Sequence, residues 1–116
     1  LDNPGYFLTT SQEGFEIVKN VSHPYVRFQF DTYHIQMMEG NLEQKIRDEI
    51  GWIGHIQFAD YPGRHEPGSG AIDFKAVLSA IQQSGYEDCI GLEYIPLLKG
   101  AETLNWAFSQ LRLTQV

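Results

Sequence analysis

The sequence predicts an α/β fold with a parallel sheet, organised like part of a (β/α)₈ barrel. Helix-like and strand-like segments alternate along the chain in the order α-β-α-β-α-β-α, which is typical of parallel βαβ units. Successive strands are roughly 30 residues apart, about the size of one barrel unit. A closed barrel needs about 250 residues, whereas the chain has 116. We therefore expect about three strands and about four helices, as a small open sheet or as part of a larger domain.

The first half of the chain contains two expected helices and one strand. A helix from Thr9 to Val21 is predicted by apolar residues at helical spacing and by Thr10 and Glu13, which match a capping box. The segment from Tyr25 to Asp31 alternates apolar and polar residues, as a half-buried strand does. A second helix begins near Asn41. The apolar stripes are Phe15, Val18 and Val21 in the first helix and Leu42, Ile46, Ile50 and Ile53 in the second.

The second half repeats the alternation. Ile53–Ala59 and Cys89–Tyr94 have the composition of strands. A third helix follows Asp73, which is placed to cap it, and ends before Gly85. A last helix is predicted from Ala101 to Leu111. The inward stripes are Phe74, Val77, Leu78 and Ile81 in the third helix and Leu104, Phe108 and Leu111 in the last.

Each predicted strand carries polar residues on one face, although parallel strands buried on both faces are usually apolar throughout. The polar faces end in three side chains with oxygen atoms: Asp31, Gln57 and Glu93. In a barrel this face is the interior, and its C-terminal rim carries the active site. Oxygen ligands suit a hard divalent cation such as Mg²⁺ or Mn²⁺. A sheet with one solvated face alternates in the same way, so the spacing leaves both interpretations open.

Two loops carry candidate substrate-binding residues. His34 comes three residues after Asp31, so it can lie over the same rim. The loop from Asp60 to Gly70 is longer than the usual ~2–6 residues, and it places two prolines and three glycines around Arg64. This composition favours a defined loop whose Arg binds a carboxylate with both guanidinium arms. The alternative is an ordinary exposed His and Arg.

Composition excludes some classes of partner. The net charge of −7 argues against a nucleic-acid partner, and the chain has no apolar run of about 18 residues that would span a membrane. The first residues lack a signal-peptide pattern and an initiator Met. Cys89 is the single cysteine, which makes a reducing cytoplasm the default expectation.

Several motifs follow one another in an order that resembles a known family. They are Asn-Pro-Gly-Tyr-Phe-Leu from residue 3, Asp-Thr-Tyr-His-Ile-Gln-Met-Met-Glu-Gly from residue 31, Gly-His-Ile-Gln-Phe-Ala-Asp from residue 54, Pro-Gly-Arg-His-Glu-Pro-Gly-Ser-Gly from residue 62, and Gly-Leu-Glu-Tyr from residue 91. Together they resemble the hydroxypyruvate isomerases of the xylose-isomerase-like (β/α)₈ superfamily. The resemblance implies that residues 1–116 are the C-terminal part of a single TIM-barrel domain.

The resemblance also implies roles for individual residues. Asp31, Gln57 and Glu93 would be metal ligands, and Glu93 would also be one of two acid/base glutamates. His34 and Arg64 match the positions that hold the substrate. The family's other glutamate precedes the Asn-Pro-Gly motif, which puts it outside this chain. One departure is Ala71, where the family usually has Glu, and this puts a packing contact of the loop in doubt.

The implied reaction interconverts hydroxypyruvate and tartronate semialdehyde by moving a proton between adjacent carbons. The intermediate is an enediolate, whose charge a divalent cation stabilises, while carboxylates remove and return the proton. The expected partner is therefore a small hydroxy or keto acid, and a homo-oligomer is possible.

Other readings stay open. A 2-oxo-tetronate isomerase or a ketose 3-epimerase would share the metal site, although in the epimerases we expect His at the position of Gln57. A nuclease of this fold would need more His ligands and a basic surface. A binding domain or an inactive fragment is the alternative outside enzymes.

Overall fold

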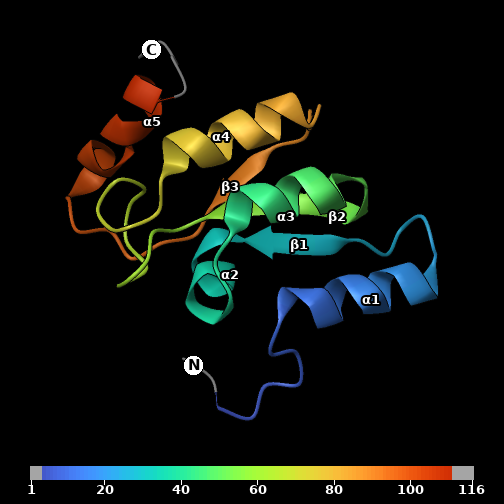
Figure 1. Cartoon of the computed structure of the whole chain (residues 1–116). Coiled ribbons are helices and arrows are strands. Elements are labelled where there is room, and N and C mark those ends of the chain that lie inside the picture. Colours follow the sequence, from blue (N-terminus) through green and yellow to red (C-terminus); the bar gives the residue numbers. More distant parts are fainter. Residues whose placement is uncertain (1–3, 111–116) are drawn as a thin grey trace.

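The computed structural model describes residues 4–110. Its three strands are β1 (Phe28–Asp31), β2 (Ile53–Phe58) and β3 (Ile90–Leu92). They form one parallel sheet in the order β1-β2-β3, with helices between successive strands (Figure 1). The predicted α/β class and the parallel sheet are therefore confirmed. Three parallel strands form only part of a barrel.

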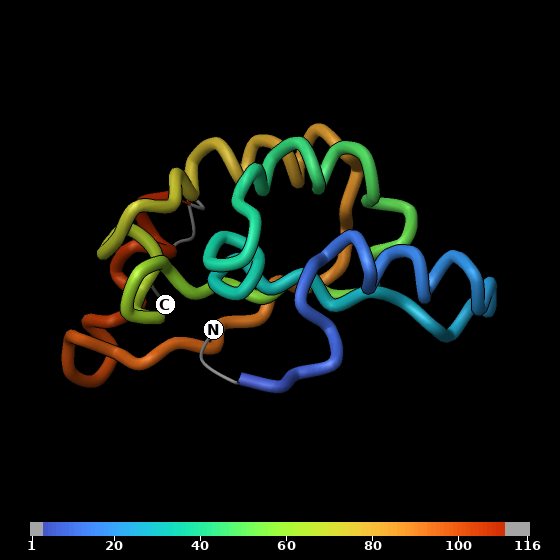
Figure 2. The backbone as a smooth tube through the Cα atoms, turned by 60° about the horizontal axis from the view of Figure 1, so that its bottom comes forward, coloured from blue at the N-terminus to red at the C-terminus, as the bar shows by residue number. Residues whose placement is uncertain are grey.

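The helices gather mainly on one side of this sheet. Figure 2 shows α3 and α4 side by side above the strands, while residues 4–10 pass on the other side. The α-helices are α1 (Ser11–Val21), α2 (Thr32–Met38), α3 (Leu42–Glu49), α4 (Phe74–Gln83) and α5 (Asn105–Gln110); two 3₁₀ helices are η1 (Ile50–Trp52) and η2 (Gly100–Leu104). None of the helices in residues 4–110 is long and apolar enough to cross a membrane.

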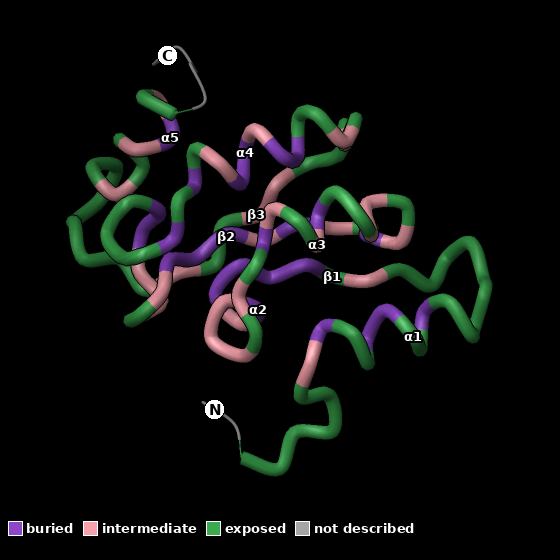
Figure 3. Tube along the Cα trace, in the orientation of Figure 1, coloured by how far each residue is buried: buried purple, intermediate pink, exposed green. Residues whose placement is uncertain are grey.

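The hydrophobic core lies between the sheet and its helices. Phe30, Ile56 and Phe58 point towards the helices and are fully buried, and they pack in one cluster with Ile46 of α3 and Val77 of α4. Figure 3 shows buried residues along β1 and β2 and at intervals along α3 and α4. The opposite sheet face carries the polar side chains, as the alternation predicted: Gln29 is exposed, Gln57 is half-buried and Asp31 is buried.

The predicted helix starts are largely confirmed. Thr10 and Glu13 form both hydrogen bonds of a capping box at the start of α1. The Asp73 side chain accepts a hydrogen bond from the Ala76 N–H at the start of α4. Asn41 precedes α3 as expected, but its side chain makes no capping hydrogen bond. Val21, which was expected to face inward, is 52% exposed.

The segment after Asp31 was predicted as a loop, and this prediction is wrong. Residues Thr32–Met38 form α2, so the described residues contain five α-helices where about four were expected. The Asp31 side chain caps this helix by accepting the His34 N–H at 3.0 Å. A helix of seven residues is too short to show a clear apolar period in the sequence.

The observed strands are shorter than the predicted ones. Tyr25 lies in a turn before β1, where the Val26 N–H donates to the His23 carbonyl oxygen at 3.0 Å. Only Ile90–Leu92 pair with β2, so Cys89 and Tyr94 lie outside β3. The alternation of apolar and polar side chains continues beyond the residues whose backbones pair in the sheet, which explains why the predicted strands were too long.

Two predicted helices also change at their ends. The helix after Asn41 stops at Glu49, because Ile50 begins the 3₁₀ turn η1 and Ile53 already belongs to β2. The last helix divides into η2 and α5, and Leu104 is 37% exposed, whereas Ala107 is buried. Leu111, the third expected inward residue, lies outside the described residues.

Candidate functional site

The sheet register brings the three predicted ligand positions to the same edge. Asp31 at the end of β1 pairs with Gln57 of β2, and Gln57 pairs with Gly91 of β3. Glu93 lies just beyond β3, where its backbone N–H donates to the Phe58 carbonyl oxygen at 3.2 Å. Because the strands are parallel, their carboxyl ends meet, and the side chains of these ends become neighbours.

The Gln57 side chain connects the two carboxylates. Its Nε2 donates to Asp31 Oδ2 at 3.3 Å and to Glu93 Oε2 at 2.6 Å. Its Oε1 accepts from Gln29 Nε2 at 3.1 Å, so Gln29 holds the amide in this orientation. Two acidic groups that would repel each other are thus joined by one polarised N–H₂ group.

Arg64 reaches the same carboxylate from the loop after β2. Its guanidinium donates to Glu93 Oε2, the oxygen that also accepts from Gln57. The guanidinium carbon lies 5.7 Å from the centre of the Tyr33 ring, a cation–π distance. The Glu93 side chain is 60% exposed, so a small molecule in solvent can reach this pair.

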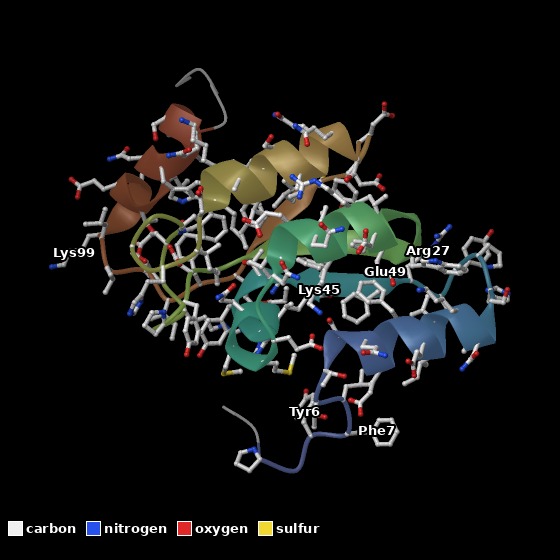
Figure 4. All side chains as sticks on the ribbon, viewed as in Figure 1. Tyr6, Phe7, Arg27, Lys45, Glu49 and Lys99 are labelled. Carbon is white, nitrogen blue, oxygen red and sulfur yellow. The ribbon has the colours of Figure 1, made fainter. Side chains whose placement is uncertain are left out.

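A pocket of about 560 Å³ opens beside these groups, and Asp31, His34, Gln57 and Glu93 contribute to its wall. Tyr6 and other residues of the N-terminal segment also line this pocket. Figure 4 shows Tyr6 on this segment below α1, with the neighbouring Phe7 ring pointing away from it. Four of the five predicted site residues therefore border one cavity, and Arg64 joins them through Glu93.

His34 owes its position to Asp31. Its backbone N–H is the one that Asp31 Oδ1 accepts at the start of α2, and its ring stands edge-on to Tyr33 with centroids 5.2 Å apart. One carboxyl oxygen of Asp31 thus orders the helix that carries His34, while the other faces Gln57. The two residues form one unit rather than two independent contacts.

The donor set fits a hard divalent cation in its chemistry. Two carboxylates converge on one point, which the Gln57 amide nitrogen occupies. Within residues 4–110, no three His, Cys, Asp or Glu side chains gather as a metal site, and at this point the third donor is an amide. Turning the Gln57 amide would present Oε1 to the carboxylates, and an oxygen set of this kind suits Mg²⁺ or Mn²⁺.

Asp60 had no predicted role, and it organises the loop that carries Arg64. Asp60 is fully buried, and its two oxygens accept four backbone N–H groups at 2.8 to 3.0 Å. The donors are Tyr61, Gly68, Gly70 and Ile72. The loop is therefore defined, as its glycines and prolines predicted.

Glu66 is a second buried acidic residue in this loop, and it too had no predicted role. Burial raises the pKa of its carboxyl group, but hydrogen bonds from the Thr103 hydroxyl and from the Leu97 and Leu98 N–H groups outweigh burial and lower the pKa to about 2. Glu66 is therefore ionised throughout the ordinary pH range. Its sequence signal was only its place in the Arg-His-Glu-Pro-Gly segment.

Comparison with known proteins bears on this arrangement. The model of the xylose isomerase-like TIM barrel family matches residues 1–109. The chain belongs to this family. It is 39% identical over 105 residues to a 2-oxo-tetronate isomerase of Cupriavidus necator, and this match covers 90% of the chain and 40% of that protein. It is 35% identical over 105 residues to the hydroxypyruvate isomerase of Escherichia coli, with 90% and 41% covered.

Solved structures agree with the fold. A protein described as an AP endonuclease of family 2 from Brucella melitensis matches 93% of the chain and 42% of its own length, with 36% identity and a TM-score of 0.88. The IolI protein with a bound zinc atom matches 93% and 44%, with 26% identity and a TM-score of 0.70. This chain of the family spans about 40% of the curated relatives' length. The expected family and fold are thus confirmed.

Proposed function

We propose that this chain supplies the metal-binding and proton-transferring part of an isomerase that interconverts hydroxypyruvate and tartronate semialdehyde. One observation carries the proposal: the Gln57 amide joins the carboxylates of Asp31 and Glu93 at the carboxyl ends of three adjacent parallel strands, and Arg64 reaches the same point. Relatives named hydroxypyruvate isomerase match nine-tenths of the chain. The residue types are those that the reaction needs.

In this proposal Arg64 binds the carboxylate of the substrate. A guanidinium offers a planar pair of donors that matches a carboxylate. In the structure Arg64 donates to Glu93 instead, so an incoming substrate carboxylate competes with Glu93 for the same cation. Binding of the substrate then loosens the ion pair and frees Glu93 to accept a proton.

Glu93 would be one of the two carboxylates that move the proton between the two adjacent carbons of the substrate. It borders the pocket and is largely exposed, so its carboxylate can reach a bound molecule. General acid–base transfer of this kind contributes about 10²–10⁴-fold to a rate. His34 also lines the pocket, and in this proposal its ring donates to a substrate oxygen.

Asp31, Gln57 and Glu93 would hold a divalent cation such as Mg²⁺ or Mn²⁺. When bound, the ion would stabilise the negative charge that develops on the substrate oxygens. Gln57 has to present Oε1 for this, and Gln29 must then accept the amide N–H₂ rather than donate to it. The pairing of the two amides allows both to turn together.

A 2-oxo-tetronate isomerase is the second candidate, because the relative of that name in Cupriavidus necator is 39% identical to the chain. A tetronate has one carbon more than hydroxypyruvate, so the two candidates differ in the length of the substrate. An epimerase is less well supported, because Gln57 stands where we expect His.

A chimera tests the proposal. The region of the Escherichia coli hydroxypyruvate isomerase that matches this chain is replaced by residues 1–116, and conversion of hydroxypyruvate and of 2-oxo-tetronate is measured with Mn²⁺. We expect conversion of hydroxypyruvate, lowered about 10²–10⁴-fold by Glu93→Gln. A folded chimera that converts only 2-oxo-tetronate would favour the second candidate. Equal rates for the chimera and its Glu93→Gln variant would show that Glu93 has no catalytic role.

A further inference from the structure

The Glu66 carboxylate connects two loops that lie far apart in the sequence. Only 5% of the residue is exposed. Its Oε1 accepts from the Leu97 N–H at 2.9 Å, from the Leu98 N–H at 3.0 Å and from the Thr103 hydroxyl at 2.6 Å, and its Oε2 accepts from the Leu97 N–H at 3.0 Å. Glu66 belongs to the loop before α4, whereas every one of these donors comes after β3. The carboxylate is therefore a bridge between the loops.

Neighbouring residues reinforce the same connection. The Ile95 N–H donates to the Arg64 carbonyl oxygen at 2.7 Å, and His65 Nδ1 lies 2.7 Å from the Ile95 carbonyl oxygen. Arg64 itself carries the guanidinium group, and Ile95 lies two residues after Glu93, which carries the carboxylate. The backbone that carries the guanidinium is thus tied to the backbone that carries the carboxylate.

The backbone at Arg64 needs such support. Arg64 has a φ of +59° and Gly63 a φ of +94°. Residues with a side chain rarely adopt a positive φ, and they keep it where the surroundings hold it. The bonds of Glu66, two residues later, are among the contacts that can fix this turn.

Asp60 and Glu66 divide the work in the loop. Asp60 accepts N–H groups from within residues 61–72, so it sets the internal shape of the loop. Glu66 accepts from the segment after β3, so it sets where the loop sits relative to Glu93. Loss of Glu66 should therefore displace a loop that keeps its own shape.

We propose that Glu66 is a positioning residue, which holds the Arg64 loop against the segment after Glu93 and so fixes the direction from which the guanidinium meets a carboxylate substrate. The part that concerns the substrate rests on the proposed function. Glu66 itself touches neither substrate nor metal in this proposal. Its effect is to place Arg64.

Amide hydrogen exchange tests the placement without any activity. Three variants of the full chain, Glu66→Gln, Glu66→Ala and Thr103→Val, are compared with Glu87→Gln, which changes an exposed glutamate. We expect exchange at Leu97 and Leu98 to rise about tenfold or more in Glu66→Ala and less in Thr103→Val. Exchange at Gly68 and Gly70 should stay unchanged, because Asp60 holds them. Unchanged exchange at Leu97 and Leu98 in both Glu66 variants would overturn the proposal.

Kinetics of the chimera test the consequence for substrate. We expect Glu66→Gln to raise KM for hydroxypyruvate about tenfold while kcat stays within about threefold. A misplaced Arg64 weakens binding of the substrate carboxylate equally in the ground state and in the transition state, which changes KM and leaves kcat. An active parent with an unchanged KM in Glu66→Gln would overturn the role in positioning. If exchange changes as expected but even the parent chimera is inactive, the proposed function fails and the bridge between the loops remains. Thr103→Val covers the case in which Glu66→Ala does not fold.

Discussion

Acid should remove the stabilisation that Glu66 provides, and its size can be worked from the structure. The pKa of Glu66 is about 2 in the folded chain, against an ordinary value of 4.5. A carboxyl group with a lowered pKa stabilises the fold above pH 4.5 and loses this contribution as the pH falls towards 2. The difference corresponds to about 3 kcal/mol, an upper bound because the loop lies near solvent.

The assay compares the free energy of unfolding of the chain and of Glu66→Gln between pH 2 and pH 7, measured with urea. The gap between them should be constant above about pH 5 and shrink steadily below pH 4.5. The groups that donate to Glu66 are two backbone amides and the Thr103 hydroxyl, and none of them titrates in this range. Glu87→Gln is the control, because it removes an exposed carboxyl group. A gap for Glu66→Gln that does not change with pH would refute the reasoning.

Three further predictions address the loop and its arginine. In the active chimera, Arg64→Lys should lower kcat/KM at least about tenfold, because Lys lacks the planar fork, and a change within about twofold would make Arg64 a bystander. Asp60→Asn should raise exchange at the Gly68 and Gly70 amides more than at Leu97, since Asn offers one acceptor oxygen in place of two. Gly70→Ala should destabilise the chain by about 1–3 kcal/mol, because a Cβ there would lie 2.4 Å from the Tyr61 carbonyl oxygen; Gly51→Ala, with no atom within 4 Å of its Cβ, is the neutral control by thermal melting.

Local patterns were enough to predict much of the framework. The capping box of α1 and the Asp73 cap of α4 depend on residues three apart, so the sequence contains them in full. The position of Asp31, Gln57 and Glu93 at one edge followed from strand alternation and parallel order alone, and the register places them there. The family resemblance supplied their expected roles.

Non-local hydrogen bonds explain what the sequence did not predict. The donors to Glu66 lie more than 30 residues away, and no spacing rule links them. Asp60 accepts hydrogen bonds from backbone N–H groups, which nearly every residue has, so the sequence does not indicate which of them it binds. Helix α2 was missed because Asp31 was assigned only as a ligand, whereas one of its oxygens also caps that helix. Leu104 is exposed because the chain there forms a 3₁₀ turn, which alters the facing of a helical stripe.

Asp31, Gln57 and Glu93 are proposed to form one site for a divalent cation, and binding of Mn²⁺ tests this most directly. The free Mn²⁺ signal in electron paramagnetic resonance is followed as the full chain is added, with Asp31→Asn, Glu93→Gln and Gln57→Glu as variants and Glu87→Gln as control. We predict that the chain binds Mn²⁺, that the first two variants weaken binding about tenfold or more, and that Gln57→Glu strengthens it by adding a charged oxygen. Binding that is equal in all variants, or absent from the parent chain, would contradict the account.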